Sequence, residues 1–230
     1  MKKKIIYLIS SIMTFTLLIC LITSSCQKSN DDSNITTGTV SDIDGNEYKT
    51  IKIGSQWWMA ENLKVSKFRN GDSIPDVTDS SFWNSNNNAA YCWYNNDISN
   101  KELFGALYNW NVVKDHRNVA PEGWHIPTTS EWNVLINFLG GDSIAGLSLK
   151  STNGWFNNGN GNNNSGFNSF SSGFRDYSGI FLNVGASFWT TTTLESGRNY
   201  CRILYPQGND IILGIAYDKE GLSIRCIKDN

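Results

Sequence analysis

Apolar residues recur at helical spacing in the middle of the chain, between Gly123 and Gly141. Thr128 lies three residues before Glu131, a spacing typical of a capping box, in which the two side chains satisfy free N–H groups at a helix start. Gly140 supplies a residue that readily ends a helix. The apolar stripe between these signals consists of Trp132, Leu135, Ile136 and Leu139. This pattern predicts an amphipathic helix of about three turns, which is marginal alone in water, so we expect it to pack on a β-sheet.

Short segments with strand-like patterns stand on both sides of this helix. Asp44-Gly45 predicts a hairpin turn, and Gly54-Ser55 predicts a second turn directly after it. We therefore expect an N-terminal meander and, near the C-terminus, a closing antiparallel sheet. The expected strands are Thr39–Ile43, Tyr48–Ile53, Gln56–Met59, Tyr91–Tyr94, Phe188–Thr193, Arg198–Tyr205, Ile211–Tyr217 and Leu222–Lys228.

A second helix is expected before the central one. Leu103, Leu107 and Trp110 recur near helical spacing, which predicts a short helix ending around Asp115. Another short element is expected at Ala145–Lys150. Both of the main predicted helices would then flank one sheet.

Two polar tracts predict long surface loops. The segment from Asn70 to Asn88 is rich in Asp, Ser and Asn, with scattered Phe82 and Trp83. The segment from Asn157 to Asn164 consists of asparagine and glycine and has no apolar side chain. We expect both to be surface loops, and the second to have no role in the core.

The N-terminus has the residue order of a secretory signal segment. Lys2–Lys4 precede an apolar run, Ile5–Ile22, and the small residues Thr23–Ser25 stand directly before Cys26. An ordinary transmembrane anchor is the alternative, although the run is barely long enough. The end of the run resembles a bacterial lipobox, which implies cleavage after residue 25 and lipidation of Cys26.

The segment after the cysteine, residues 26–36, is polar and has no periodicity, so it predicts a flexible tether. Its Asp31-Asp32 pair resembles the surface-export signals of lipoproteins of the Bacteroidetes. These features predict a signal peptide at 1–25, a tether at 26–36 and one folded domain at 37–230. The expected location is the outer membrane, with the lipid as the only membrane attachment, and the resemblance to export signals implies that the domain faces outward.

The charge balance argues against nucleic-acid binding. Residues 1–25 carry three of the 19 Lys and Arg residues and none of the 21 Asp and Glu residues. The remainder therefore has 16 basic against 21 acidic side chains, a net charge of −5. Its basic residues are dispersed and form no stripe. A folded segment of about 195 residues is long enough for a core without metal or disulfide staples.

Five collinear motifs carry a resemblance to a known family. They are Asp44–Thr50 running into Trp58–Leu63, Ala90–Asp97, Gly105–Trp110, the Trp124–Trp132 segment that begins the central helix, and Ser223–Ile227. Together they resemble the Fibrobacter succinogenes major paralogous domain over roughly residues 38 to 229. The helix motif and the closing Arg-Cys segment are also similar to the formylglycine-generating and C-type-lectin-like folds. The resemblance implies an α+β, C-type-lectin-like fold, with two short helices flanking an irregular antiparallel sheet with long loops.

Three cysteines remain once Cys20 is removed with the signal and Cys26 is lipidated: Cys92, Cys201 and Cys226. In an oxidising compartment this number predicts one disulfide and one spare thiol. Cys201 and Cys226 are each in phase with apolar neighbours of their strands, so their pairing is our first choice. The family usually has a cysteine where this chain has Ala120, and Cys201 would replace it.

The chain offers little for catalysis or metal binding. His116 and His125 are the only histidines, and His125, inside the helix motif, is expected to be a hydrogen-bonded structural residue. No zinc spacing and no calcium signature of the lectins is present, and Pro206–Asp210 is expected to be a hairpin loop. We therefore expect no catalytic residues, no metal, no cofactor and no enzymatic activity.

Aromatic and amide side chains on the loops suit a binding site. Sugars stack on aromatic rings while amides and carboxylates take their hydroxyls. Trp124 and Trp132 are assigned to the core. The candidate ligand-binding residues are Trp83, Trp93, Tyr94, Trp155, Phe156, Tyr177, Tyr205, Asn209 and Asp210, although a structural role is expected for most single aromatics. An extracellular glycan is the leading partner, an envelope protein is the alternative, and an enzyme of the formylglycine-generating type has the least support.

Overall fold

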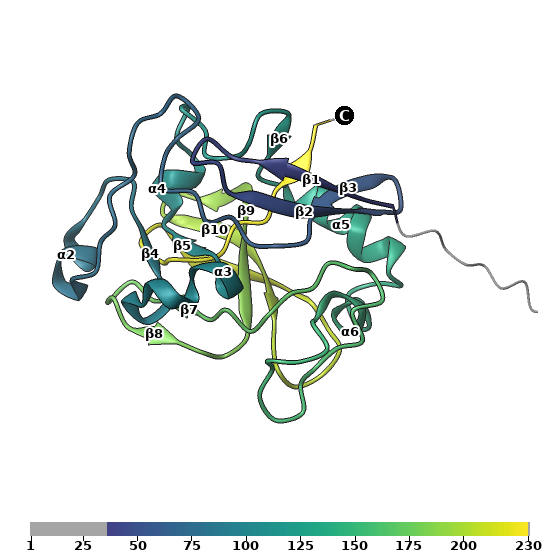
Figure 1. Ribbon diagram of the computed structural model, residues 1–230. Helices are drawn as coiled ribbons and strands as arrows, with labels where there is room; N and C mark the ends of the chain where they lie inside the picture. The colour runs from purple at the N-terminus through teal and green to yellow at the C-terminus, as the bar shows by residue number, and fades with distance from the viewer. Residues whose placement is uncertain (1–35, 230) are drawn as a thin grey trace, which may run out of the picture. The chain divides into compact units, whose positions relative to one another are not determined.

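A meander of three antiparallel strands begins the part of the chain described by the structure, a computed structural model that covers residues 36–229 (Figure 1). Both predicted turns are present, with Asp42 accepting the N–H groups of Asp44 and Asn46 in the first, and Gly54 at φ 60° in the second. Two short strands extend the meander to a five-stranded sheet of order β1-β2-β3-β12-β6. Its strands are β1 (Thr37–Ser41), β2 (Glu47–Ile53), β3 (Gln56–Met59), β6 (Trp124–His125) and β12 (Ile227–Lys228).

The closing antiparallel sheet is confirmed for three of its four predicted strands, because β12, within the predicted strand Leu222–Lys228, pairs with β3 and β6 instead. Its order is β11-β10-β9, and the strands are β9 (Ala186–Glu195), β10 (Arg198–Leu204) and β11 (Ile212–Tyr217). β11 is an edge strand of this sheet. Its residues Leu213, Ile215 and Tyr217 alternate along one face and are exposed.

The final segment pairs less regularly than predicted, because only β12 is a strand within Leu222–Lys228. Its backbone groups bond to several different elements in turn. Leu222 exchanges hydrogen bonds with Tyr108, Ser223 pairs with the β9 segment, and the carbonyl of Cys226 accepts from the N–H of Met59. The segment therefore runs between the two sheets and joins them.

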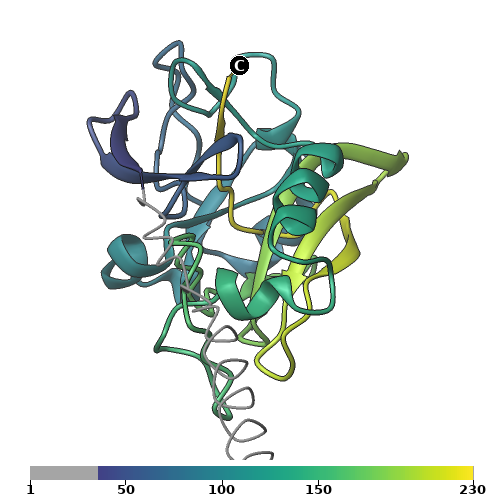
Figure 2. The same ribbon diagram turned by 90° about the vertical axis from the view of Figure 1, so that its right-hand side faces the viewer.

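The central helix is α5 (Thr129–Phe138), and its predicted capping box is present. Thr128 Oγ1 accepts from the N–H of Glu131 at 3.2 Å, and Glu131 Oε2 accepts from the N–H of Thr128 at 2.7 Å. Gly140 follows at φ 100°. The helix lies against β9 (Figures 1 and 2). Trp132 is fully buried, with its ring centroid 4.8 Å from that of Trp58 and 5.7 Å from that of Phe188.

The predicted helix from Leu103 to Asp115 is wrong, because three short elements occupy this segment. Gly105 adopts φ 68° and packs so closely that a Cβ there would lie 2.7 Å from the Cβ of Asn62. This backbone conformation ends one helical turn and starts a strand. The elements are α3 (Lys101–Phe104), β5 (Ala106–Tyr108), which pairs with β4 (Tyr91–Trp93), and α4 (Trp110–Val113), preceded by the 3₁₀ turns η1 (Tyr94–Asn96) and η2 (Ile98–Asn100).

The first predicted loop contains a helix, α2 (Ser80–Ser85), capped by Asp79, which accepts from the N–H of Phe82 at 2.7 Å. Trp83 anchors α2 in the protein and is 2% exposed. The second loop also packs against the domain, contrary to our expectation. Gly159 is buried, and a Cβ there would lie 2.2 Å from the carbonyl oxygen of Pro206.

Ordered turns hold this second loop. Asn160 Oδ1 accepts from the N–H of Trp155 at 3.0 Å, and Asn163 Oδ1 accepts from the N–H of Asn168 at 2.8 Å. Asn157, Asn158 and Asn163 all adopt positive φ, a conformation that asparagine tolerates better than most residues. The expected element at Ala145–Lys150 is present beside it as α6 (Ala145–Leu149).

The described residues belong to one compact unit, Ile35–Asn230, with an α+β fold built of mostly antiparallel sheets. A small hairpin of β7 (Phe174–Arg175) and β8 (Phe181–Leu182) completes it. None of the helices within residues 36–229 is long and apolar enough to cross a membrane. The predicted signal peptide, Cys26 and all but the last residue of the tether lie outside the described residues.

Candidate binding site

Two exposed tyrosines meet at one surface. Tyr177 lies in the turn between β7 and β8, and Tyr217 is the last residue of β11. Their side chains are 55% and 51% exposed, and their rings pack edge to face with centroids 6.3 Å apart and planes at 76°. Both rings therefore keep apolar surface open to solvent.

The turn that carries Tyr177 is rigid because Asp176 organises it. Asp176 Oδ1 accepts from the N–H of Ser178 at 2.9 Å, from its hydroxyl at 2.7 Å and from the N–H of Ile180 at 2.9 Å. The preceding residue, Arg175, is fully buried and donates to the carbonyls of Gly179 and Thr78, each at 3.0 Å. The ring of Tyr177 is thus presented from a hydrogen-bonded turn.

Helix α2 forms the opposite side of this surface. Trp83 Nε1 donates to the carbonyl of Lys219 at 2.7 Å, and Lys219 Nζ donates to the carbonyl of Asn84 at 2.6 Å. The guanidinium of Arg175 lies 4.5 Å from the centre of the Trp83 ring. These contacts fasten α2 to the turn that follows β11, so that Tyr217 and Asn84 keep a defined separation.

These elements enclose a cleft of about 570 Å³, here called the tyrosine cleft. The cleft is lined by Asn84, Tyr177, Gly197, Tyr217, Asp218 and Lys219. Asp218 Oδ1 accepts from Asn199 Nδ2 at 2.7 Å, which orients the carboxylate. The cleft therefore combines two aromatic faces with an amide, a carboxylate and an amine.

A partly buried acid, Glu220, directly follows the cleft residue Lys219 in the chain. The N–H of Glu220 donates to the carbonyl of Tyr217 at 2.9 Å. Burial raises the pKa of the Glu220 carboxyl to about 7, and the charge of Asp176 acts in the same direction. This group changes its charge near neutral pH beside the strand end that carries Tyr217.

Only one of the predicted ligand-binding residues, Tyr177, lies in this cleft. Trp83, Trp93, Tyr94 and Trp155 are buried, each less than 10% exposed. Trp83 lies in α2, Trp93 in β4, Tyr94 in η1 and Trp155 in the loop after α6, and all four rings pack into the core. The sequence prediction that placed them on a binding face is not supported by their burial.

The other predicted candidates belong to a second region, formed by the asparagine-rich loop and the β10–β11 connection. Phe156 and Tyr205 are exposed there, and Asn209 and Asp210 follow. Lys150 Nζ donates to the carbonyls of Gly208, at 2.8 Å, and Tyr205, at 3.4 Å. Gly159 of the loop packs closely on Pro206 of the connection, and none of these four candidates lines the tyrosine cleft.

The model of the Fibrobacter succinogenes major domain matches residues 51–228. The chain belongs to this family. No significant match is found among curated proteins or among solved structures.

The motifs that characterise this Fibrobacter succinogenes major domain lie mostly in its core. His125 has the predicted structural role, with Nδ1 2.6 Å from Asp229 Oδ1 and Nε2 2.8 Å from Glu131 Oε1. Burial lowers the pKa of His125, but hydrogen bonds to Asp229 and Glu131 outweigh it, so the pKa is raised overall. Tyr108 and Trp110 are buried as well. The tyrosine cleft residues lie outside these motifs.

The predicted Cys201–Cys226 bridge is not formed, because Cys92, Cys201 and Cys226 are all free and buried. Cys201 lies in β10, whose neighbours are β9 and β11, whereas Cys226 precedes β12 of the other sheet. Phase with apolar neighbours placed both thiols correctly in the core but could not show that they belong to different sheets. Burial raises the pKa of Cys92 and Cys201 to about 12.

Sequence reasoning missed Tyr217, Asn84 and Lys219. Tyr217 was predicted only as part of a strand. The sequence of β11, however, places apolar residues on both faces of the strand, whereas a strand with one buried face needs them on one side only. That excess was the available signal. Asn84 and Lys219 had no signal, because their proximity arises from the packing of α2. Within residues 36–229 no group of three His, Cys, Asp or Glu side chains could hold a metal ion.

Proposed function

We propose that this domain binds a glycan in the tyrosine cleft. The observation that carries the proposal is the pair of half-exposed rings of Tyr177 and Tyr217 beside Asn84 and Asp218. The apolar C–H face of a sugar stacks on such rings, while an amide and a carboxylate take its hydroxyl groups. Because the turn and α2 are already held by hydrogen bonds, binding would cost little ordering of the protein.

The proposed role is binding without chemistry. Asp218 and Lys219 are both engaged in hydrogen bonds within the protein, at 2.7 Å and 2.6 Å. General acid–base catalysis needs a side chain that is free to exchange a proton with the substrate, whereas these two side chains are already bonded within the protein. An enzyme of the formylglycine-generating type has little support, since the three described cysteines are buried.

We further propose that the domain is displayed on the outer membrane through a lipid on Cys26. The order of basic, apolar and small residues before Cys26 supports this location. Growth of cells with a fatty-acid analogue should label the wild type and not Cys26→Ala. Equal labelling and equal membrane retention of the two proteins would show that the lipoprotein assignment is wrong.

A glycan array with the purified protein tests the binding proposal. Tyr217→Ala and Tyr177→Ala should each remove most binding, because each deletes one stacking face. Tyr205→Ala is the matched control, since it removes a tyrosine that is 37% exposed and lies outside the cleft. Binding that is lost in the Tyr205 variant and kept in the Tyr217 variant would place the site in the wrong region.

An interaction with an envelope protein is the second candidate function, favoured by the exposed apolar face of β11. Leu213 and Ile215 stand in line with Tyr217 and are 46% and 44% exposed on an edge strand. Edge strands of this kind can pair with another chain. If the wild type binds no glycan and a pull-down recovers one envelope protein that Ile215→Lys no longer captures, the second function replaces the first.

A further inference from the structure

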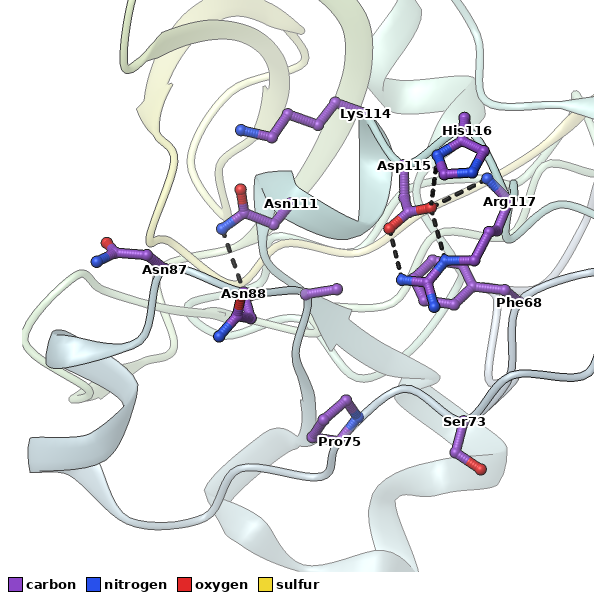
Figure 3. A pocket seen from close by; sticks show the side chains of 11 residues that line it. Phe68, Ser73, Pro75, Asn87, Asn88, Asn111, Lys114, Asp115, His116 and Arg117 are labelled. Atoms are coloured by element: carbon purple, nitrogen blue, oxygen red, sulfur yellow. Dashed lines mark hydrogen bonds and ion pairs between the residues drawn. The ribbon is translucent and has the colours of Figure 1, made fainter.

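A second cleft lies close to the tyrosine cleft. It encloses about 670 Å³, and its polar lining includes Asn87, Asn88, Asn111, Lys114, His116 and Arg117; it is called here the asparagine cleft (Figure 3). The Asn88 carbonyl accepts from Asn109 Nδ2 at 2.8 Å, from Asn86 Nδ2 at 3.1 Å and from Asn111 Nδ2 at 3.4 Å. This network of amides holds one side of the cleft in place.

The guanidinium of Arg117 forms the other side and is paired with two carboxylates. It donates to Asp115 through Nε and Nη2 at 2.9 and 2.7 Å, and to Asp72 through Nη1 at 3.0 Å. It also stacks 4.0 Å from the centre of the Phe68 ring. Two carboxylates therefore neutralise this charge, and Arg117 serves as a fixed wall of the cleft.

Lys114 is different, because its charge is not compensated. Figure 3 shows the Lys114 side chain extending away from Asp115, around which His116 and Arg117 gather. None of the ion pairs among residues 36–229 includes Lys114. Asn87 and Ser73 add exposed donor groups to the same cleft. The Asp115 carboxylate also lines the cleft but is paired with Arg117, so the groups left for a ligand are the Lys114 amine and the exposed donors, which suit one anionic group.

The two clefts adjoin the same elements. Asn84 lines the tyrosine cleft and Asn87 the asparagine cleft, and three residues of chain span at most about 11 Å. On the opposite side, the N–H of Trp110 donates to the carbonyl of Asp218 at 3.0 Å, which places Asn111 one residue from that contact. A short oligosaccharide could therefore reach from one cleft to the other.

We propose that the asparagine cleft binds the carboxylate or sulfate group of an acidic glycan whose neighbouring neutral sugar stacks on Tyr177 and Tyr217. This inference rests on the proposed glycan-binding function and names the class of glycan. The orientation follows from charge. In the tyrosine cleft the charge of Asp218 is offset by that of Lys219, whose amine is bonded to the Asn84 carbonyl, whereas Lys114 in the asparagine cleft is in no ion pair with another described residue and attracts an anion. The domain as a whole is acidic, so the attraction is local.

Binding of the full-length protein to three polysaccharides tests the proposal: a polyuronate, a sulfated glucan without carboxylates and an unmodified glucan. The wild type should bind at least one acidic polymer several-fold more tightly than the glucan, and the preference should weaken at high salt. The comparison of polyuronate with sulfated glucan distinguishes the two anionic groups. Thermal melting verifies that each variant is folded.

Lys114→Gln should lower affinity for the acidic polymer about fivefold, the size of one exposed charge contact, and should leave glucan binding unchanged. Lys52→Gln is the matched control, since it removes an exposed lysine of β2 that lines neither cleft, and it should have no effect. Tyr217→Ala should weaken binding of both polymers.

The outcomes separate this inference from the proposed function. Equal affinity for acidic and neutral glycans, with Tyr217→Ala still harmful, would overturn the acidic specificity and leave glycan binding intact. Acidic binding that Lys114→Gln and Lys52→Gln weaken equally would show general attraction and overturn the site. Absence of binding to all three polymers and to a glycan array would overturn both proposals.

Discussion

The aromatic residues beneath α5 and those of the tyrosine cleft show how differently one residue type is used in this domain. Trp58, Trp132 and Phe188 are fully buried, and the Trp132 ring contacts both others, with centroids 4.8 Å from Trp58 and 5.7 Å from Phe188. Tyr177 and Tyr217 also touch, yet half of each side chain faces solvent. The first group stabilises the fold by excluding water, whereas the second leaves its apolar faces available to a ligand.

The largest effect on stability should come from the buried group. Trp132→Ala should lower the free energy of unfolding by about 3–5 kcal/mol, because it leaves a large cavity between α5 and the sheet. Chemical denaturation measures it. Trp132→Phe is the control, and should cost much less, since it keeps a ring and removes an indole N–H that has no hydrogen-bond partner among the described residues. Equal costs for the two variants would mean that the ring volume does not matter here.

Replacing Asn157–Asn164 with a Gly/Ser linker should now be destabilising, by roughly 2–3 kcal/mol. The replacement removes the side-chain acceptors of Asn160 and Asn163, each of which contributes on the order of 1 kcal/mol, and lowers backbone rigidity. Thermal unfolding of the loop variant checks this. An unchanged melting temperature would restore the original expectation that the loop has no structural role.

Glu220 should make stability depend on pH at the tyrosine cleft. Its pKa is raised from 4.5 to about 7 by burial. The protonated carboxyl therefore contributes fully to the free energy of unfolding below the unfolded pKa, and this contribution is lost as pH rises through about 7. Glu220→Gln should therefore stabilise the domain at pH 8 by about 1–3 kcal/mol relative to the wild type, and should change it little near pH 4. Denaturation at both pH values, with the exposed Glu122→Gln as control, measures the difference. A constant offset at both values would contradict this prediction.

Thr128→Ala should cost about 1 kcal/mol, because it removes one half of the capping box of α5. Thr128→Ser keeps the hydroxyl and should lose much less. Urea denaturation of the two variants compares them. A similar loss in both would assign the cost to the methyl group and its packing.

The smallest effect on stability should come from the cleft itself. Tyr217→Ala removes a ring that is half exposed and should change the free energy of unfolding by well under the cost of Trp132→Ala, about 0.5–1 kcal/mol. The same variant should lose glycan binding. A calorimetric melt and a binding titration on one sample provide both values. A large loss of stability would remove the distinction between the two groups of aromatics.

The sequence by itself determined the local elements whose signals lie close together. The capping box at Thr128, the apolar stripe of α5, the turns at Gly45 and Gly54 and the strands of the closing sheet were all predicted, because each depends on residues a few positions apart. The motifs also indicated the family over most of the chain. The structural role of His125 followed from its place in the helix motif.

The tertiary structure alone decided the breaks and the site. The close approach of Asn62 to Gly105 divides a helix-like pattern into α3, β5 and α4, and the separation of two sheets keeps Cys201 and Cys226 apart. Whether an aromatic residue is buried or exposed also depends on what packs over it. Trp83 is covered by Arg175 and the 218–221 turn, whereas Tyr177 and Tyr217 are not covered. The contacts that cover Trp83 join segments more than 90 residues apart in sequence, so local sequence patterns do not reveal them.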